Sequence, residues 1–382
     1  MSAPRTGLVA ILLTISVYGI GMGLTLPLLS LTLENMGVSG TLNGLNLATG
    51  GLAALLVTPL MPAGIARLGT TQFMAAALTF AAGALLCLHF VASLWAWFPI
   101  RFVLSASLNG LFVATEFWIN AIADEHNRGR YVALYSICLT GSYALGPLVL
   151  QIIGTTGLAP FAAGAALLIS AIVPIILARR HAPKTKAAAG HRAVFGILRE
   201  APVAFGAAAV FGAIDVGMAG LLPVYAVRQG YSDAHAALAV SALSLGALLL
   251  QFPLGWLADR MARQRLLALC AGCGVIGAAL TPFAVRNPVT FYLVLILWGG
   301  IVLGIYSVAL TLLGERFSGP SMATANAAFV MSYCLGLLGG PALEGAALQA
   351  WNPQGLIVVL GGICAGYLGF LLLRPPIDIY TE

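Results

Sequence analysis

The sequence predicts an all-α polytopic membrane protein in which twelve transmembrane helices form two pseudo-symmetric six-helix bundles. Three observations predict this fold: an apolar composition, twelve apolar runs of membrane-spanning length, and landmarks that recur at a constant separation. Of the 382 residues, 60% are hydrophobic and 8% are charged, and the mean hydropathy is +0.99. This composition excludes a soluble domain, a disordered chain, a disulfide scaffold and a nucleic-acid binder.

The apolar runs are long enough for helices that cross a bilayer, which need about 20 residues each. Strands of a membrane barrel would instead read as alternating segments of roughly 10 residues. The first run follows Arg5 and is longer than a signal-peptide core, so we expect it to remain as an anchor. The expected spans are 7–33, 41–63, 72–92, 94–121, 130–153, 157–178, 203–227, 235–257, 264–284, 288–313, 321–346 and 355–373.

Basic residues are distributed unevenly between the two sides that these spans define. The loops after odd-numbered spans contain two, Arg228 and Arg286, whereas the termini and the other loops contain fifteen of the 18. Because basic loops stay on the cytoplasmic side, both termini are predicted to be cytoplasmic. The predicted location is the plasma (inner) membrane, with a multi-pass topology.

The chain divides near its middle into two related parts. A basic loop at 179–202 separates an N-terminal bundle, 1–178, from a C-terminal bundle, 203–382. Matched landmarks at a fixed separation indicate an internal repeat. The pairs separated by 194 residues are Gly146-Pro147 with Gly340-Pro341, and Pro59 with Pro253.

The loop after the eighth span carries the motif that identifies a family. The run from Gly255 to Arg265 contains Asp259 and Arg260 and resembles the loop signature of the major facilitator superfamily, with Ala262 replacing a glycine. The corresponding copy after the second span, residues 62–69, has Ala66 where the family carries an acid. The resemblance covers the whole chain and implies two six-helix bundles around a central site that is open to one side at a time.

A narrower resemblance, to the YcaD-like branch of transporters, is carried by short runs in the first half and the eleventh span. These are Arg101-Phe102-Val103, Glu116, Arg128-Gly129-Arg130 and Ser332-Tyr333. In the superfamily's proton-coupled exporters the fourth span carries an arginine in the pattern Arg-x-x-x-Gly. Arg101 matches that arginine, although Ser105 takes the glycine position.

Four charged residues are placed within the spans, where a charge is costly and usually faces a partner or a water-filled site. Asp215, near the middle of the seventh span, is the leading candidate for proton coupling together with Arg101. The alternative is that Asp215 is a fixed partner of Arg101 or of a nearby backbone group. Arg101 is an anchor for an anionic substrate or a modulator of a nearby carboxyl group, and the alternative is a side chain that reaches the outer interface.

We expect the other two charged residues, Glu116 and Glu344, to have structural or gating roles. Glu116 lies about 22 Å along the helix from Arg101 at 1.5 Å per residue, which is too far for a direct pair. We expect it to bond Arg128 or Arg130 in a cytoplasmic gate, to which Asp259 and Arg260 also belong. Glu344 lies near the outer end of its span, where we expect water to reach it.

The remaining candidates follow from the family resemblance and from polar or aromatic residue type. Gly141, Gly146 and Pro147 resemble the helix bend of the family's antiporters, and packing alone is the alternative. Spans one, four, seven and ten line the central site in the family. The candidate substrate contacts on them are Tyr18, Thr25, Ser107, Asn109, Met218, Trp298, Tyr306 and Ser307.

Together these features predict a secondary active transporter that moves a small organic solute by alternating access, coupled to protons. Export is favoured, with import of a nutrient or vitamin-like metabolite as the alternative. A membrane receptor or embedded enzyme without transport is the alternative of another class. We expect no enzymatic activity, no cofactor, no metal site and no nucleic-acid partner, and a monomer in the lipid bilayer.

Overall fold

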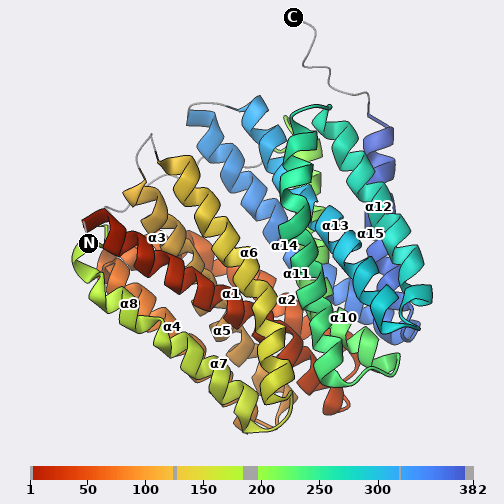
Figure 1. Cartoon of the computed structure of the whole chain (residues 1–382), viewed down its shortest axis with the longest axis horizontal. Helices are drawn as coiled ribbons and strands as arrows, with labels where there is room; N and C mark the ends of the chain where they lie inside the picture. Colours follow the sequence, from red (N-terminus) through yellow and green to blue (C-terminus); the bar gives the residue numbers. More distant parts are fainter. Residues whose placement is uncertain (1–2, 124–126, 184–196, 318–319, 375–382) are drawn as a thin grey trace, which may run out of the picture.

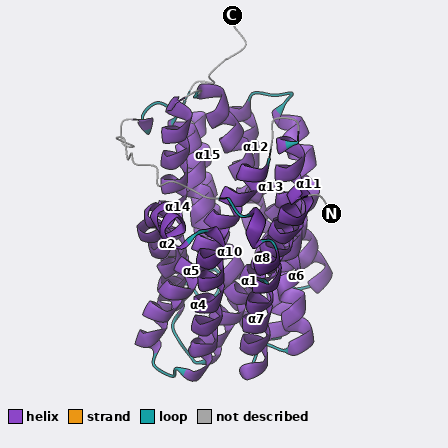
Figure 2. Ribbon diagram, turned by 90° about the vertical axis from the view of Figure 1, so that its left-hand side faces the viewer, coloured by secondary structure: helices purple, strands orange, loops and turns teal. Residues whose placement is uncertain are grey.

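The computed structural model describes residues 3–123, 127–183, 197–317 and 320–374. Every regular element in these ranges is helical (Figure 2). Twelve helical segments of the described chain are long and apolar enough to cross a membrane. The predicted fold class and number of spans are confirmed.

The first half of the chain forms six spans, two of which are interrupted. Its elements are α1 (Ala3–Asn35), α2 (Gly40–Val57), the 3-10 turn η1 (Thr58–Leu60), α3 (Met61–Leu68), α4 (Thr70–Phe90), α5 (Leu94–Ile122), α6 (Arg128–Ile153), α7 (Leu158–Ser170), α8 (Ile172–Leu177) and the 3-10 turn η2 (Arg179–His181).

The second half forms six spans without such interruptions. They are α10 (Pro202–Arg228), α11 (Asp233–Ala258), α12 (Arg263–Ala284), α13 (Pro288–Arg316), α14 (Pro320–Ala350) and α15 (Gly355–Leu372). Of the separating basic loop, residues 184–196 lie outside the described part.

The repeat is therefore imperfect around its proline landmarks. Pro59 lies in the η1 turn between α2 and α3, whereas Pro253 lies inside the continuous helix α11. The residues 62–69 that the sequence pattern placed in a loop are mostly helical, since α3 extends to Leu68 and ends at Gly69, whose φ is 81°. That positive φ favours glycine.

Each half is built around one tightly packed helix pair, α1 with α6 and α10 with α14. A side chain added at Gly23 or Gly146 would collide with the backbone of the partner helix. The same is true of Gly212 and Gly340 in the second half. Small residues let two helix backbones approach closely in a membrane. The repeat of Gly146 at Gly340 thus corresponds to the same close approach in both halves.

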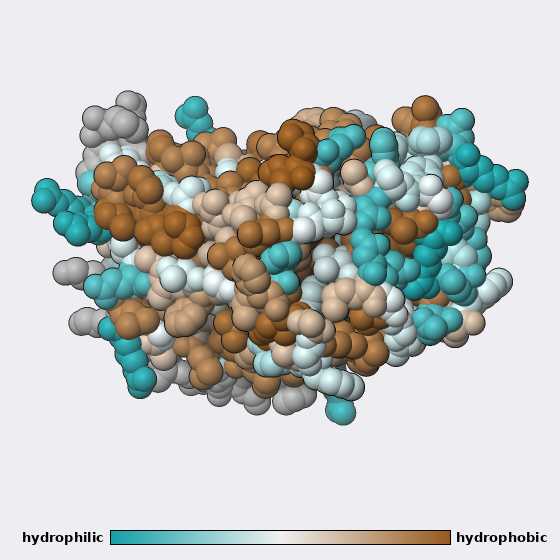
Figure 3. Space-filling model, turned by 90° about the horizontal axis from the view of Figure 1, so that it is seen from below, coloured by the Kyte–Doolittle hydropathy of each residue, from teal (hydrophilic) through white to brown (hydrophobic). Residues whose placement is uncertain are grey.

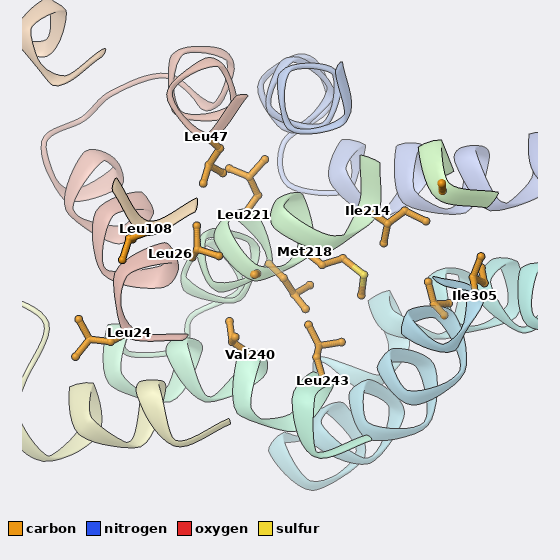
Figure 4. Packing of buried hydrophobic residues seen from close by; sticks show 14 of the residues in the cluster. Leu24, Leu26, Leu47, Leu108, Ile214, Met218, Leu221, Val240, Leu243 and Ile305 are labelled. Atoms are coloured by element: carbon orange, nitrogen blue, oxygen red, sulfur yellow. The ribbon is translucent and has the colours of Figure 1, made fainter. Parts of the chain in front are cut away.

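We call the face where α1 begins and α15 ends the terminal face, and the other the far face. The two halves, red to yellow and green to blue in Figure 1, converge toward the far face. We call the interface between the two halves the seam. In it, a side chain added at Gly44 of α2 would collide with the backbone of Pro341 and Gly345 of α14. Buried leucines fill the same seam, with Leu47 of α2 beside Leu221 of α10 (Figure 4).

The outer surface is largely apolar. Figure 3 shows broad hydrophobic areas toward its left and centre, with hydrophilic residues gathered toward its right. Ile152 is 85% exposed and Phe252 is 81% exposed. Such exposure suits contact with lipid rather than with water.

Candidate substrate and coupling site

Asp215 of α10 lies between the two halves and is held by α14. The hydroxyl of Tyr333 donates a hydrogen bond of 3.0 Å to Asp215 Oδ2. The side chain of Asp215 is half-buried. A carboxyl group with one tyrosine partner and partial access to solvent can exchange a proton or bind a polar group of a solute.

Aromatic rings surround this carboxyl group in the second half. Phe211 packs on Tyr306 with ring centroids 4.9 Å apart and on Tyr333 at 5.6 Å. Tyr306 also contacts Phe329 of α14 at 5.2 Å. These side chains come from α10, α13 and α14, so three helices build one aromatic wall beside Asp215.

The first half contributes a second aromatic group from α1, α5 and α6. Tyr18 packs on Phe112 with ring centroids 5.6 Å apart. Tyr18 and Tyr143 both lie within electrostatic range of Asp215 across the seam. The two halves therefore face one another through tyrosine hydroxyls, which can donate or accept hydrogen bonds.

Arg101 of α5 is 3% exposed and does not reach the surface. Its Nε and Nη1 atoms have no hydrogen-bond partner among the described residues. Tyr143 lies within its electrostatic range. The predicted alternative, a side chain that extends to the outer interface, is therefore wrong, because the guanidinium group is enclosed by the protein.

Glu116 of α5 is exposed, yet it lies within electrostatic range of Tyr18 in its own half and of Tyr306 in the other. Its carboxylate thus lies between the halves, on the terminal-face side of Asp215. Arg130 is exposed, and no ion pair between it and Glu116 occurs in the described chain. The side chain of Arg128 lies outside the described residues.

The Asp-Arg motif ends α11 on the terminal face. Asp259 is exposed and forms the C-terminal boundary of the helix, and the guanidinium of Arg260 lies 3.7 Å from the ring of Trp256. Nearby, Arg263 forms an ion pair with Glu315 of α13. Within the described chain, neither Asp259 nor Arg260 pairs with the first half.

At the far face, in contrast, polar contacts join the two halves. We call this set of contacts the far-face gate. Glu34 of α1 and Arg228 of α10 form a two-bond ion pair at 2.8 and 2.9 Å. Asn35 donates to Asp233 at 2.6 Å, and the amide of Gly40 donates to Gln349 Oε1 at 3.0 Å. These contacts hold the far face closed.

The other sequence-predicted residues have varied positions. Thr25, Met218 and Trp298 are buried, and Trp298 packs against Gly277 of α12. Asn109 donates to Thr58 Oγ1 within the first half, Ser107 is half-buried and Ser307 is exposed. Of the predicted bend, Gly146 and Pro147 are buried and Gly141 is open to its surroundings.

Two features escaped the sequence reasoning. Phe211 and Phe112 are ordinary apolar residues in an apolar chain, and nothing in the sequence distinguished them. The Glu34–Arg228 pair could have been found from the sequence, because these two residues are separated by 194 positions, the spacing of the repeat. Opposite charges at equivalent positions of two related halves can meet near the axis that relates them.

Glu344 of α14 differs from its predicted environment. Water access was expected near the end of the span, but the residue is 0% exposed. Both carboxyl oxygens lack a hydrogen-bond partner among the described residues. Its carboxyl group is enclosed against Gly217 of α10, so that expectation is wrong.

Comparisons with known proteins agree with this architecture. The family model described as Major Facilitator Superfamily matches residues 11–341 and 232–380. The uncharacterized MFS-type transporter YfkF of Bacillus subtilis (strain 168) is 23% identical, with 97% of each chain covered. The uncharacterized MFS-type transporter YcaD of Escherichia fergusonii is 26% identical over 85% of this chain and 83% of the relative. The similarity to YcaD confirms the predicted branch.

A solved structure shows the same fold. The nucleoside transporter NupG, as its D323A mutant, superposes with a TM-score of 0.83 at 16% identity, covering 96% of this chain and 99% of the other. These relatives and this neighbour are transporters and not enzymes. With a family model that spans nearly the whole chain, this protein belongs to the Major Facilitator Superfamily of membrane transporters.

Proposed function

We propose that the protein is a secondary active transporter that moves a small organic solute by alternating access and couples this movement to protons. The observation that carries the proposal is Asp215, a half-buried carboxyl group between the halves, bonded to Tyr333 and within electrostatic range of Tyr18. Proton binding at such a group changes the charge that the two halves present to each other. A change of this kind can bias one conformation over another.

The aromatic residues support an organic solute with a planar or apolar part. Tyr18 and Phe112 face the site from the first half, and Phe211 and Tyr306 from the second. Aromatic rings provide apolar contact area, and tyrosine hydroxyls add hydrogen bonds that orient a ligand. The solute substitutes for water between these two walls and is released when they separate.

The distribution of basic residues supports a cytoplasmic terminal face in the plasma (inner) membrane. In that orientation the far-face gate closes the outside, and the exposed Glu116, Asp259 and Arg260 face the cytoplasm. The stretch from Gly141 to Pro147, which resembles the antiporter bend, supports export with proton entry. The protein acts as a monomer, since each chain supplies both walls of the site.

The test is flux in proteoliposomes. A thermal-shift screen of the purified protein against metabolites and toxic amphipaths identifies a solute, because a specific ligand stabilises the native state. Radiolabelled solute then moves against its gradient when a pH gradient is imposed. Asp215→Asn keeps exchange of the solute down its gradient and abolishes the response to pH.

The matched control is Glu200→Gln, which neutralises an exposed carboxylate outside the spans. It leaves the response to pH unchanged. A pH response that survives in Asp215→Asn contradicts the assignment of Asp215. Binding of the solute without any flux contradicts transport.

A further inference from the structure

Glu344 is a charged residue type in an environment that gives it no partner. It is 0% exposed, and neither carboxyl oxygen has a hydrogen-bond partner among the described residues. Gly217 of α10 lies so close that even a methyl group there would collide with the carboxyl group. An ionised carboxylate is strongly disfavoured in such a site, whereas a neutral carboxylic acid is tolerated.

Among the described residues of α2, α10, α14 and α15, no basic side chain forms an ion pair with Glu344. α2 contains no ionisable side chain, and the described titratable groups of α15 are Cys364 and Tyr367, of which Cys364 lies within electrostatic range. α14 itself offers Tyr333 and Cys334. α10 offers Asp215 and Tyr225, and its Arg228 is bonded to Glu34, Leu348 O and Asn352.

The position of Glu344 links it to the seam between the halves. It lies on α14 between Pro341 and Gly345, and the backbones of both approach Gly44 of α2 closely. The contact between α2 and α14 therefore flanks the segment that carries Glu344, whose carboxyl group faces Gly217 of α10. When the far face opens, α2 and α14 separate, and water can approach this segment from the far side.

We propose that Glu344 is a second proton-carrying site, whose carboxyl group must be protonated for the far face to close. It differs from Asp215 in accessibility, because Asp215 is half-buried in the present state while Glu344 is sealed. Opening of the far face exposes Glu344, which releases its proton to that side. A proton must return before the seam can close again. This inference rests on the alternation of the proposed function.

The direction of the pH effect follows from this linkage. Raising the pH removes the proton from Glu344 and favours the far-face-open state, by up to tenfold in the open-to-closed ratio per pH unit for one proton.

The experiment measures the distance across the far face in the full-length purified protein in nanodiscs, without solute or gradient. Spin labels are placed on cysteines at Met36 and Trp351, which are 44% and 60% exposed and flank the seam. Cys87, the exposed native cysteine, is replaced by serine. In the otherwise unchanged protein, the long-distance population increases as the pH is raised.

Glu344→Gln, which imitates the protonated group, keeps the far face closed at every pH, and Glu344→Asp restores the dependence. Asp215→Asn retains the response. A response in Glu344→Gln equal to that of the unmodified protein overturns the proposal, as does one abolished by Asp215→Asn alone. Since no flux is measured, failure of transport in liposomes leaves this result interpretable.

A second measurement applies if Glu344→Gln does not fold. Infrared spectra of protein labelled with ¹³C-glutamate report protonated glutamate without a contribution from Asp215. The far-face-closed state shows a ¹³C-labelled protonated carboxyl band that is lost in Glu344→Asp, because the aspartate carries no label. Absence of that band from the closed state overturns the proposal.

Discussion

The two ends of the seam between the halves differ in how they are held together. At the far face, Glu34 and Arg228 share two hydrogen bonds, and Gly44 lies against the backbone of α14. At the terminal face, Asp259 and Arg260 are exposed. Closure of the far face thus uses two separate devices, close backbone packing and a largely buried ion pair.

The largest effect is expected from blocking the backbone packing. Gly44→Leu places a side chain where the backbone of Pro341 and Gly345 lies, and a helix backbone cannot move aside as a flexible side chain can. Overpacking of this kind costs about 3 kcal/mol, or roughly a hundredfold in the closed population. Distance measurements across the far face therefore find it mostly open, and solute flux falls with it.

Gly83→Leu is the matched control, because Gly83 of α4 has no neighbouring atom within 4 Å of an added side chain. It leaves both the closed population and the flux near their original values. A Gly44→Leu protein that closes normally contradicts the importance of the α2–α14 contact.

The next effect tests the ion pair. Glu34 and Arg228 side chains are only 17% and 14% exposed, so Arg228→Met leaves a largely buried carboxylate without its partner. Hydrogen bonds to charged groups contribute about 2 kcal/mol, which corresponds to roughly thirtyfold in the closed population. Cross-linking across the far face decreases accordingly.

The charge exchange Glu34→Arg with Arg228→Glu restores part of the closure, because the ion pair forms again while the bonds from Arg228 to Leu348 O and Asn352 stay lost. The two positions are equivalent in the repeat, so each helix can present either charge to the other. Failure of the exchanged pair to recover any closure contradicts a direct electrostatic role and favours loss of packing around Arg228.

Features that depend on local properties of the sequence could be predicted, whereas features that depend on how the helices pack could not. Spans and bundles depend on composition and run length, which are local properties, and their prediction is confirmed. Asp215 was singled out because a charge in an apolar run is conspicuous. Its partner Tyr333 was named only as part of the Ser332-Tyr333 run, because a hydrogen bond between α10 and α14 depends on helix rotation.

The prediction for Glu344 was wrong for the same reason, because it also depends on how the helices pack. Its distance from the helix end suggested access to water, but accessibility depends on which helices pack over it. Here the carboxyl group lies against Gly217 of α10, and the residue is 0% exposed. No pattern along α14 alone distinguishes an exposed acid near a helix end from a sealed one.

A smaller effect is expected at Tyr333. Tyr333→Phe removes the one hydrogen bond that the described structure gives Asp215 and keeps the ring that packs on Phe211. We expect solute binding to persist, while the pH dependence of coupling changes because Asp215 loses its hydrogen-bond donor. Flux at a series of pH values measures this change. An unchanged pH profile contradicts a role for this hydrogen bond.

The smallest effect on the present state is expected at the terminal face. Arg260 is exposed and its guanidinium lies over Trp256 of its own helix, so Arg260→Ala removes no described contact between the halves. Surface substitutions of this kind change stability by about 0.5 kcal/mol or less, so the far-face-closed population changes by no more than about twofold.

If Arg260 belongs to a gate that forms only when the terminal face closes, the same variant slows transport while leaving the present state populated. Distance measurements across the far face and flux in the same preparation separate these effects, and a large loss of far-face closure in Arg260→Ala contradicts the assignment of separate devices to the two faces.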